Sequence, residues 1–354
     1  MPIRSDSTSR CSFREPLHDS DIDALAADPQ VKHLQTSEPA SLDTWRRIND
    51  QLLALRPDVE VRIYGFYRAL CDLSFVPLLS NVRRFAADSL HGPVSGLEFM
   101  AALPSSLESL SVGMWGLRDF GFLESVTPSL KSLHLAATKS KRPSLAPLAR
   151  FSQLETLYLE GHQKRIEVIS ELVELRDVTL RSISTPGLDY LRPLHKMWSL
   201  DLKLGGIRDL SAIAGMDGIG YFEAWQVRGL SDLSAISELH GLQHLFLQSL
   251  PHVNSLPSLR RLSKLRRVVL MNMTGLHDFA PLESAPFLEE FALIEGQAQQ
   301  PTELEPVLRN PALRRAQAGF GSLKRNRLFE SMRSAAEVGP FKYGTPFEYE
   351  SQGA

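Results

Sequence analysis

The sequence predicts an α/β solenoid, an arc of about 12 repeats with a parallel β-sheet on its concave face and short 3₁₀ or irregular helical segments on its convex face. The first observation behind this prediction is a repeated segment, which reads IGYFEAW, LQHLFLQ, LRRVVLM and LEEFALI. The second is its period, because the leading residues Ile219, Leu242, Leu265 and Leu288 stand 23 residues apart each time. The third is an apolar ladder with a spacing of three in the rest of each repeat.

The N-terminal part is predicted to consist of a mobile arm and a cap. Residues 1–20 are polar and rich in Ser and Arg, with little to bury, so we expect a mobile arm. Residues 21–58 are predicted to cap the open end of the array with an amphipathic helix, in which Ser41 is the N-cap and Pro57 follows the end. The apolar residues at helical spacing in this segment are Leu42, Trp45, Ile48, Leu52 and Leu55.

Residues 59–320 are predicted to form the repeats. Each repeat begins with a short alternating segment such as LETLYL or LRDVTL, which is typical of a strand with one buried face. Successive repeats are separated by 21 to 25 residues. They begin at Val59, Val82, Leu107, Leu130, Leu154, Leu175, Met197, Ile219, Leu242, Leu265, Leu288 and Leu313.

The second apolar ladder indicates the other side of each repeat. One example is Val253, Leu256, Leu259 and Leu262, where apolar residues recur every third position. This spacing over so short a segment favours a turn of 3₁₀ helix over a full α-helix. Each repeat is therefore predicted to be one strand followed by one tight helical segment.

With these repeats the chain resembles leucine-rich repeat proteins, and units such as LDLKLGGIRDLSAIAGM and LSDLSAISELHGLQHLFL resemble the bacterial, internalin-type class of about 22 residues. The resemblance covers about residues 59–320. It departs from the family where the family pattern has an Asn five residues after the central strand leucine, so we expect apolar packing to replace that asparagine ladder. The residues at this position are Trp115, Thr138, His162, Ile183, Gly205, Val227, Leu250 and Met273.

Residues 321–354 are predicted to form a C-terminal cap helix and an aromatic tail. The segment from Leu323 to Glu337 has helix-forming composition and is expected to cover the far end of the array. The final stretch carries four aromatic rings between Gly and Pro breaks, at Phe341, Tyr343, Phe347 and Tyr349. Two interpretations remain open for it. The rings pack on the last repeat, or the tail is an extended segment offered to a partner or to a sheet edge.

The outward-pointing residues of the strands predict a partner-binding surface on the concave face. They lie one before, one after and three after the central apolar residue of each repeat, and stacking of the strands turns them into columns. Between Leu154 and Leu293 the columns mix large aromatic side chains with charges, which is the composition of protein-binding hot spots. The predicted site residues are Tyr158, Arg181, Asp201, Lys203, Tyr221, Glu223, Trp225, His244, Phe246, Arg267, Met271 and Glu290.

Asp201 and Glu223 support a remote alternative, a hydrolase. A close acidic pair on adjacent strands can act as general acid and base. Against this, Arg181 and Lys203 stand two residues along and can neutralise the pair, and an open sheet offers no deep cleft. We therefore expect the pair to dock a basic side chain, and we predict no catalytic residues.

Composition and motifs exclude several other classes. The chain of 354 residues has 39 basic and 41 acidic residues and a net charge of −2, so neither a nucleic-acid nor a membrane partner is expected. Cys11 and Cys71 predict neither a disulfide framework nor a zinc site, and no phosphate-binding or nucleophile-elbow motif occurs. We expect no cofactor and no metal. Without a secretion signal or an 18-residue apolar run, a cytoplasmic monomer is expected.

Two further hypotheses concern the biological role. The first is a non-enzymatic scaffold that grips a partner protein through its concave face and acts by occupancy, as an inhibitor, adaptor or immunity-type partner. The alternative is a bacterial effector delivered into a host cell, for which residues 1–20 would be the delivery signal. Fold-level analogy gives a class of use and does not identify the partner.

Overall fold

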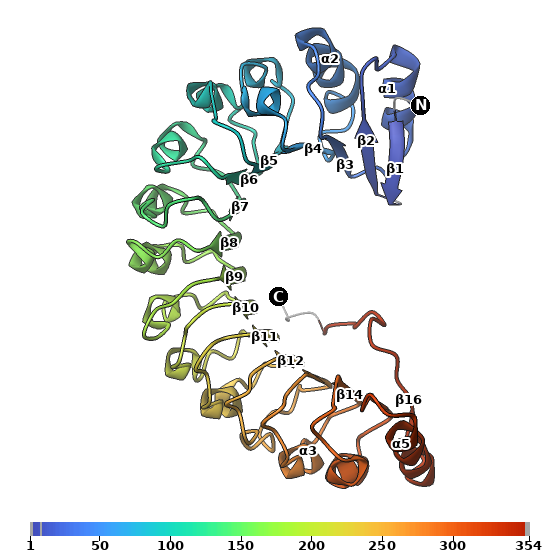
Figure 1. The fold of residues 1–354 in the computed structure, drawn as a ribbon. Coiled ribbons are helices and arrows are strands. Elements are labelled where there is room, and N and C mark those ends of the chain that lie inside the picture. Colours follow the sequence, from blue (N-terminus) through green and yellow to red (C-terminus); the bar gives the residue numbers. More distant parts are fainter. Residues whose placement is uncertain (1–2, 8, 351–354) are drawn as a thin grey trace. The chain divides into compact units, whose positions relative to one another are not determined.

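The computed structural model describes residues 3–7 and 9–350. The chain folds as two compact units that divide between Leu175 and Arg176. In each unit the strands line one side and the short helical segments line the other, as the alternation of strand and 3₁₀ spacing in the sequence predicts (Figure 1). We call the side of each sheet that faces away from the helical segments its open face.

Unit 1 begins with an antiparallel strand and continues with parallel ones. Strand β1 runs antiparallel to β2, and each later strand pairs in parallel with the one before it. The strands are β1 (Ile3–Ser7), β2 (Arg10–Phe13), β3 (His33–Thr36), β4 (Glu60–Gly65), β5 (Arg84–Leu90), β6 (Ser109–Met114), β7 (Ser132–Leu135) and β8 (Thr156–Glu160). The α-helices are α1 (Asp19–Ala27) and α2 (Leu42–Arg47), the latter continued by a π-helical turn (Ile48–Leu53). The 3₁₀ segments are Arg68–Cys71, Val76–Leu78, Leu97–Ala102, Gly121–Ser125, Ala146–Arg150 and Ile166–Glu171.

Unit 2 is parallel throughout, with each strand paired to the next in chain order. The strands are β9 (Asp177–Arg181), β10 (Ser199–Lys203), β11 (Tyr221–Trp225), β12 (His244–Gln248), β13 (Arg267–Met271), β14 (Glu290–Ile294), β15 (Arg315–Ala318) and β16 (Gly339–Pro340). The α-helices are α3 (Ala280–Glu283), α4 (Glu305–Leu308) and α5 (Leu323–Ala335). The 3₁₀ segments are Asp189–Leu191, Ser211–Ile213, Ser234–Glu238 and Pro301–Leu304.

The core of each unit lies between the sheet and the helical segments. The twelve residues predicted to open the repeats are all buried. In unit 2 the central strand residues stack in register, so each apolar side chain packs on the equivalent one of the next repeat. These fully buried residues are Leu200, Phe222, Leu245, Val268 and Phe291.

Apolar packing replaces the asparagine ladder at four of the eight positions where the sequence lacks it. The side chains of Ile183, Val227, Leu250 and Met273 are buried at the turn after each strand. His162 is buried as well, and its Nε2 lies 3.1 Å from the carbonyl oxygen of Ala136 in the preceding turn. Only part of the turn geometry therefore depends on side-chain hydrogen bonds.

Trp115 is an exception, because it is 42% exposed at the position where the family has its asparagine. It continues a row of aromatic rings along the loops that follow β4, β5 and β6. Phe66 stacks on His91 with ring centroids 4.8 Å apart, and His91 lies 6.4 Å from Trp115. Neither the periodicity nor the columns of the sequence analysis predicts this exposed row.

Near the end of unit 2, buried amide side chains tie the repeats together. Nδ2 of Asn310 donates to the carbonyl oxygens of Leu282 (2.6 Å) and Ala285 (2.8 Å) in the preceding repeat. Nε2 of Gln299 does the same to Met273 (2.7 Å) and Leu276 (2.9 Å). These ties lie on the helical side of the repeats and do not follow the family position.

We expect Asn310→Ala to lower the free energy of unfolding by about 2 kcal/mol, because it removes the two buried hydrogen bonds that Nδ2 donates to carbonyl oxygens of the preceding repeat. Urea denaturation followed by circular dichroism measures the change. Gln297→Ala is the matched control, because it removes an amide from an exposed position two residues before Gln299. Equal effects of the two substitutions would contradict a role for the buried ties.

The structure corrects the expected mobile arm at residues 1–20. The described residues include β1 and β2, which form a hairpin, and β2 pairs in parallel with β3. Cys11 and Phe13 are buried, and the Phe13 ring meets the edge of Trp45 with centroids 5.6 Å apart. A few alternating apolar residues in a polar background therefore suffice to add two strands to the sheet.

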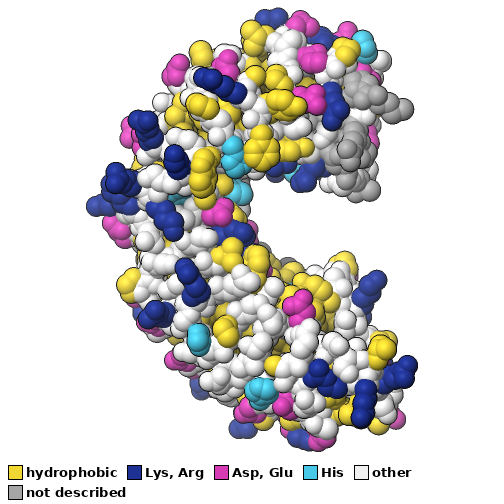
Figure 2. All heavy atoms as spheres, viewed as in Figure 1, with side chains coloured by type: hydrophobic (Ala, Val, Ile, Leu, Met, Phe, Trp, Pro, Cys, Tyr) yellow, Lys and Arg dark blue, Asp and Glu magenta, His cyan; other side chains and the backbone are white. Residues whose placement is uncertain are grey.

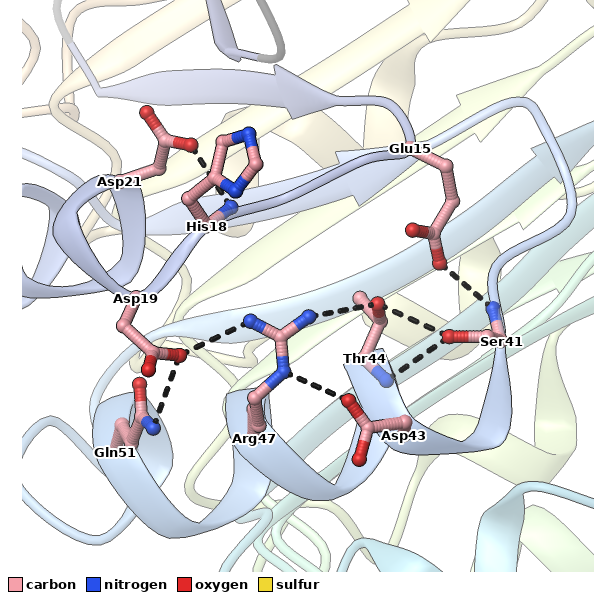
Figure 3. A network of polar contacts seen from close by, with 9 residues as sticks. All are labelled: Glu15, His18, Asp19, Asp21, Ser41, Asp43, Thr44, Arg47 and Gln51. Atoms are coloured by element: carbon pink, nitrogen blue, oxygen red, sulfur yellow. Dashed lines mark hydrogen bonds and ion pairs between the residues drawn. The ribbon is translucent and has the colours of Figure 1, made fainter.

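Polar contacts hold this N-terminal segment against the predicted cap helix (Figure 3). Arg47 donates to Asp19 (3.0 Å) and to Asp43 (3.0 Å), and the backbone N–H of Ser41 donates to Glu15 (2.8 Å). The Arg47 guanidinium lowers the pKa of Asp19 below its ordinary value. The segment is thus joined to the cap by ion pairs as well as by apolar contacts.

The cap helix forms where the sequence predicts it, with two differences. The hydroxyl of Ser41 accepts a hydrogen bond from the N–H of Thr44 (3.1 Å), which confirms the N-cap. The second half of the helix widens to a π-helical turn, Ile48–Leu53. Leu42 and Leu55, expected on the apolar face, are 53% and 71% exposed, whereas the Trp45 and Leu52 side chains are buried.

The C-terminal helix is confirmed as α5, which buries Phe329 and Arg333 against the last repeat. From β16 the chain continues as a tail, residues 341–350, that runs back across the open face of unit 2 (Figure 1). The interpretation that the tail rings pack on the repeats is correct in kind. Their contacts extend well beyond the last repeat, to residues beside β12 and β10.

Candidate partner-binding surface

The first part of the predicted surface lies on β9, β10 and β11 of unit 2. Asp201 and Glu223 occupy the same register position on neighbouring strands, and so do Lys203 and Trp225. Nζ of Lys203 lies 2.9 Å from Oδ2 of Asp201 and 3.3 Å from Oε2 of Glu223. Lys203, one of the two basic residues that the sequence analysis weighs against catalysis, therefore contacts both carboxylates.

Burial shapes the electrostatics of this group. Burial and the neighbouring charge of Asp201 raise the pKa of Glu223, although Tyr221 and Lys203 both hydrogen-bond to it. The hydroxyl of Tyr221 donates to Oε2 of Glu223 (2.7 Å), and burial together with that carboxylate raises the pKa of Tyr221. Burial alone would lower the pKa of Lys203, but the two carboxylates raise it. The site thus holds a charged lysine between two acids.

Trp225 and Arg181 extend this group along the open face. The Arg181 guanidinium lies 5.5 Å from the centroid of the Trp225 ring, within the range of a cation–π contact. Within residues 3–7 and 9–350, no hydrogen-bond partner reaches the buried Nε1 of Trp225 or Oδ1 of Asp201. A buried polar atom usually has a partner, so these two atoms are exceptions within the group.

The second part of the predicted surface is covered by the tail. Phe246 packs with Val269, Ala292 and Phe341 in one buried cluster, and Met271 lies against it. Exposure of the Phe246 ring on the sheet face, which the sequence analysis assumes, is therefore wrong. The ring contributes to a small hydrophobic core between sheet and tail.

Arg267 and Glu290 are also buried, at 5% and 3% exposure. Nε of Arg267 donates to Oε2 of Glu290 at 2.5 Å, and Arg315 donates to the other carboxylate oxygen. The Arg267 guanidinium carbon also lies 5.0 Å from the centroid of the Phe341 ring and 4.7 Å from that of the Phe347 ring. This charge pair holds the tail in place and is not offered to solvent.

His244 lies under the outer end of the tail. Its Nδ1 is 3.1 Å from the hydroxyl of Tyr349, and its ring is 5.3 Å from that of Phe347. Burial, and to a smaller extent the charge of Arg267, lowers the pKa of His244 to about 3. The imidazole is therefore neutral at physiological pH.

Tyr158 is the one predicted site residue in unit 1. Its ring lies 3.8 Å from that of His134 on the adjacent strand, and burial lowers the pKa of His134. We therefore treat Tyr158 separately from the eleven site residues of unit 2.

The sequence columns miss three residues that contact the tail. Gln243 and Arg266 each immediately precede a strand, and Trp198 does so before β10. Tyr349 meets Trp198 edge-on at 4.7 Å, and Arg266 lies 4.9 Å from the Phe347 ring. The signal that could have found them is a fourth column, two residues before the central apolar residue, where these repeats carry large side chains.

Other kinds of site find little support. Among the described residues, no group of three or more His, Cys, Asp or Glu side chains is arranged to hold a metal ion. In the same part of the chain, every helix is too short or too polar to cross a membrane. Figure 2 shows acidic and basic side chains interspersed over most of the visible face, with basic ones gathered near the end that carries α5.

The repeated strand and 3₁₀ turn, the in-register apolar stack and the open sheet face together define the leucine-rich repeat fold. A scan against protein-family models and a search of curated proteins both give no match. The structure is similar to an internalin from Listeria monocytogenes, with a TM-score of 0.58 and 16% identity over 86% of this chain and 90% of that one. The resemblance to the internalin type is thus confirmed at the level of fold.

Two structures of complexes are also similar. One is the Toll–Spatzle complex from Drosophila, with a TM-score of 0.55 and 10% identity over 89% of this chain and 50% of that one. The other is the complex of TLR13 with ssRNA13, with a TM-score of 0.54 and 16% identity over 86% of this chain and 47% of that one. This chain spans about half the length of each of these two matched chains. At these identities the similarity concerns the fold.

Proposed function

We propose that this chain is a non-enzymatic scaffold that binds a partner protein through the open face of unit 2. The observation that carries the proposal is the group of Arg181, Asp201, Lys203, Glu223 and Trp225 on three neighbouring strands. It combines an aromatic ring with charges of both signs. Such composition is typical of interaction hot spots, which are rich in Trp, Tyr and Arg.

A protein fits this surface better than a nucleic acid does. Toll, which shares the fold, is in complex with the protein Spatzle, whereas TLR13 is in complex with an RNA. The net charge of −2 and the two carboxylates beside Lys203 disfavour a polyanion. We further propose a cytoplasmic monomer that acts by occupancy, as an inhibitor, adaptor or immunity-type partner.

No specific observation favours either alternative, the bacterial effector or the hydrolase. The effector hypothesis depends on a mobile signal at residues 1–20, of which residues 3–7 and 10–13 lie in strands. The hydrolase hypothesis depends on Asp201 and Glu223, which are both paired with Lys203 on the open sheet. An acid–base pair needs one carboxyl group free to exchange its proton with a substrate.

Trp225→Ala is expected to weaken binding of the partner about 30-fold, the effect of losing a hot spot worth about 2 kcal/mol. The partner is first captured from native cell extract with the full chain, and its affinity for purified variants is then measured by calorimetry. Trp115→Ala is the matched control, because it removes an exposed tryptophan from unit 1. Loss of affinity with Trp115→Ala but not with Trp225→Ala would move the binding surface away from β9–β11.

A further inference from the structure

One set of contacts to the tail is made with its main chain. Arg267 donates to the carbonyl oxygens of Thr345 (3.0 Å) and Pro346 (3.4 Å), and Arg266 donates to that of Glu348. The side-chain amide of Gln243 forms two hydrogen bonds with Glu350, donating to its carbonyl oxygen (3.2 Å) and accepting from its N–H (2.8 Å). Hydrogen bonds to the main chain do not depend on the side chains of the bound segment, so the same groups can bind other extended peptides.

Two aromatic side chains of the tail supply the sequence preference. Phe347 lies 4.9 Å from the Arg266 guanidinium and 4.7 Å from that of Arg267, so the ring is held by two cations. Tyr349 rests against Trp198 and places its hydroxyl beside His244. An acidic residue after the tyrosine is favoured too, because the Glu350 carboxylate is 3.8 Å from Nε of Arg266.

The inner and outer parts of the tail differ in how firmly they are held. Phe341 is buried in the cluster with Phe246, Val269 and Ala292. Beyond it, residues 342–346 and 348–350 are exposed and only Phe347 is half-buried. The outer part, residues 345–350, can therefore leave the sheet while Phe341 keeps the hydrophobic cluster closed. We call the surface under this outer part, formed by Trp198, Gln243, His244, Arg266 and Arg267, the tail groove.

We infer that the tail groove binds an extended segment of a partner protein with the pattern Phe-x-Tyr followed by an acidic residue, and that residues 345–350 are a tethered competitor for it. This inference rests on the proposed function, since it names the kind of partner that the same open face takes. The tail itself shows the chemistry of the ligand, with two aromatic rings two residues apart and acidic residues beside them. The exchange needs no rearrangement of the strands.

The link between the tail and the rest of the chain determines how strongly the tail competes with a free peptide. A segment joined to its site by a short flexible linker acts at an effective concentration of about 1 mM. A free peptide with the same sequence must therefore compete with its own tethered copy. Weakening the tail without changing the groove should make the groove available to free peptide at much lower concentration.

The test uses the full chain with Phe347→Ala and Tyr349→Ala and a fluorescein-labelled peptide GTPFEYE, the sequence of residues 344–350. Fluorescence anisotropy is expected to show binding at least 10-fold tighter to this variant than to the unaltered chain. The Lys342→Ala chain, changed at an exposed tail position, should bind as the unaltered chain does. A peptide with alanine in place of both aromatic residues should not bind.

A groove-side variant makes the test independent of the tail. Adding Arg266→Ala to the double variant should weaken peptide binding at least 10-fold, because the side chain is near the surface and supports both a carbonyl contact and the Phe347 ring. Circular dichroism and the thermal midpoint confirm that each variant is folded. Unchanged peptide affinity after Arg266→Ala would overturn the tail groove as the binding site.

Three further results would overturn the inference. They are a folded double variant that fails to bind the peptide at 1 mM, equal affinity of the double variant and the unaltered chain, and a dimer of the double variant with the unaltered chain in sedimentation. The last would assign the groove to the tail of a second copy. If the peptide does not bind but the partner protein still binds and loses affinity with Trp225→Ala, only this inference is rejected. If the peptide binds but Trp225→Ala does not change the affinity for the partner protein, only the proposed function is rejected.

Discussion

Replacing Glu290 with alanine is expected to lower the free energy of unfolding of unit 2 by about 3–5 kcal/mol. Glu290 is buried and accepts hydrogen bonds from Arg267 and Arg315. Its removal leaves the buried Arg267 guanidinium without a counter-charge, and an unpaired buried charge costs far more than the pair contributes. Urea denaturation of the purified variant measures the loss.

The control for this experiment is the exposed pair of Glu283 and Arg309, whose side chains are 41% and 56% exposed. Glu283→Ala removes a carboxylate from a similar arginine contact, but water replaces the lost partner there. The control should cost much less stability than Glu290→Ala. Equal losses would show that burial beneath the tail does not determine the effect.

Release of the tail is expected to raise the pKa of His244 from about 3 toward its ordinary value of 6.5. The groups facing His244 are Tyr221 on β11, Arg267 on β13 and Tyr349 on the tail. Of these, only the tail leaves in the Phe347→Ala, Tyr349→Ala variant. NMR titration of the imidazole, assigned by comparison with a His244→Gln chain, measures the pKa in both proteins.

The same shift predicts how tail docking depends on pH. The docked tail lowers the pKa of His244, so docking favours the neutral imidazole. Docking is therefore strongest above pH 6.5, where His244 is neutral in both states, and it weakens progressively as the pH falls from 6.5 toward 3. Docking, or binding of the GTPFEYE peptide to the released groove, should be up to about 30-fold weaker at pH 5 than at pH 8. His244→Gln should remove this dependence. A pH dependence that persists in His244→Gln would assign it to another group.

The repeats could be predicted from the sequence because each one carries its own pattern. Leu200, Phe222 and Leu245 recur at nearly constant spacing, and each packs on its equivalent in the next repeat. The prediction needs no knowledge of distant contacts. The strands β1 and β2 lack that spacing, and only a few apolar residues such as Cys11 and Phe13 mark their buried face.

The candidate site could be predicted in part. The columns correctly place Asp201, Lys203 and Glu223 together, because register on adjacent strands determines which side chains meet. They leave out the tail, which joins Tyr349 to His244 across 105 residues of sequence. Such a contact has no local pattern, so the burial of Phe246, Arg267 and Glu290 was not predictable.

The tail also changes how unit 2 can come apart. In a linear array each repeat is held by the repeats beside it, so unfolding can start at an end and proceed one repeat at a time. Here the tail contacts Ala316 at one end and Trp198 at the other, and so links repeats that are not adjacent. Unfolding from the C-terminal end must first break these tail contacts. A partner that displaces residues 345–350 would therefore also unfasten the end of the array and make it more compliant under load.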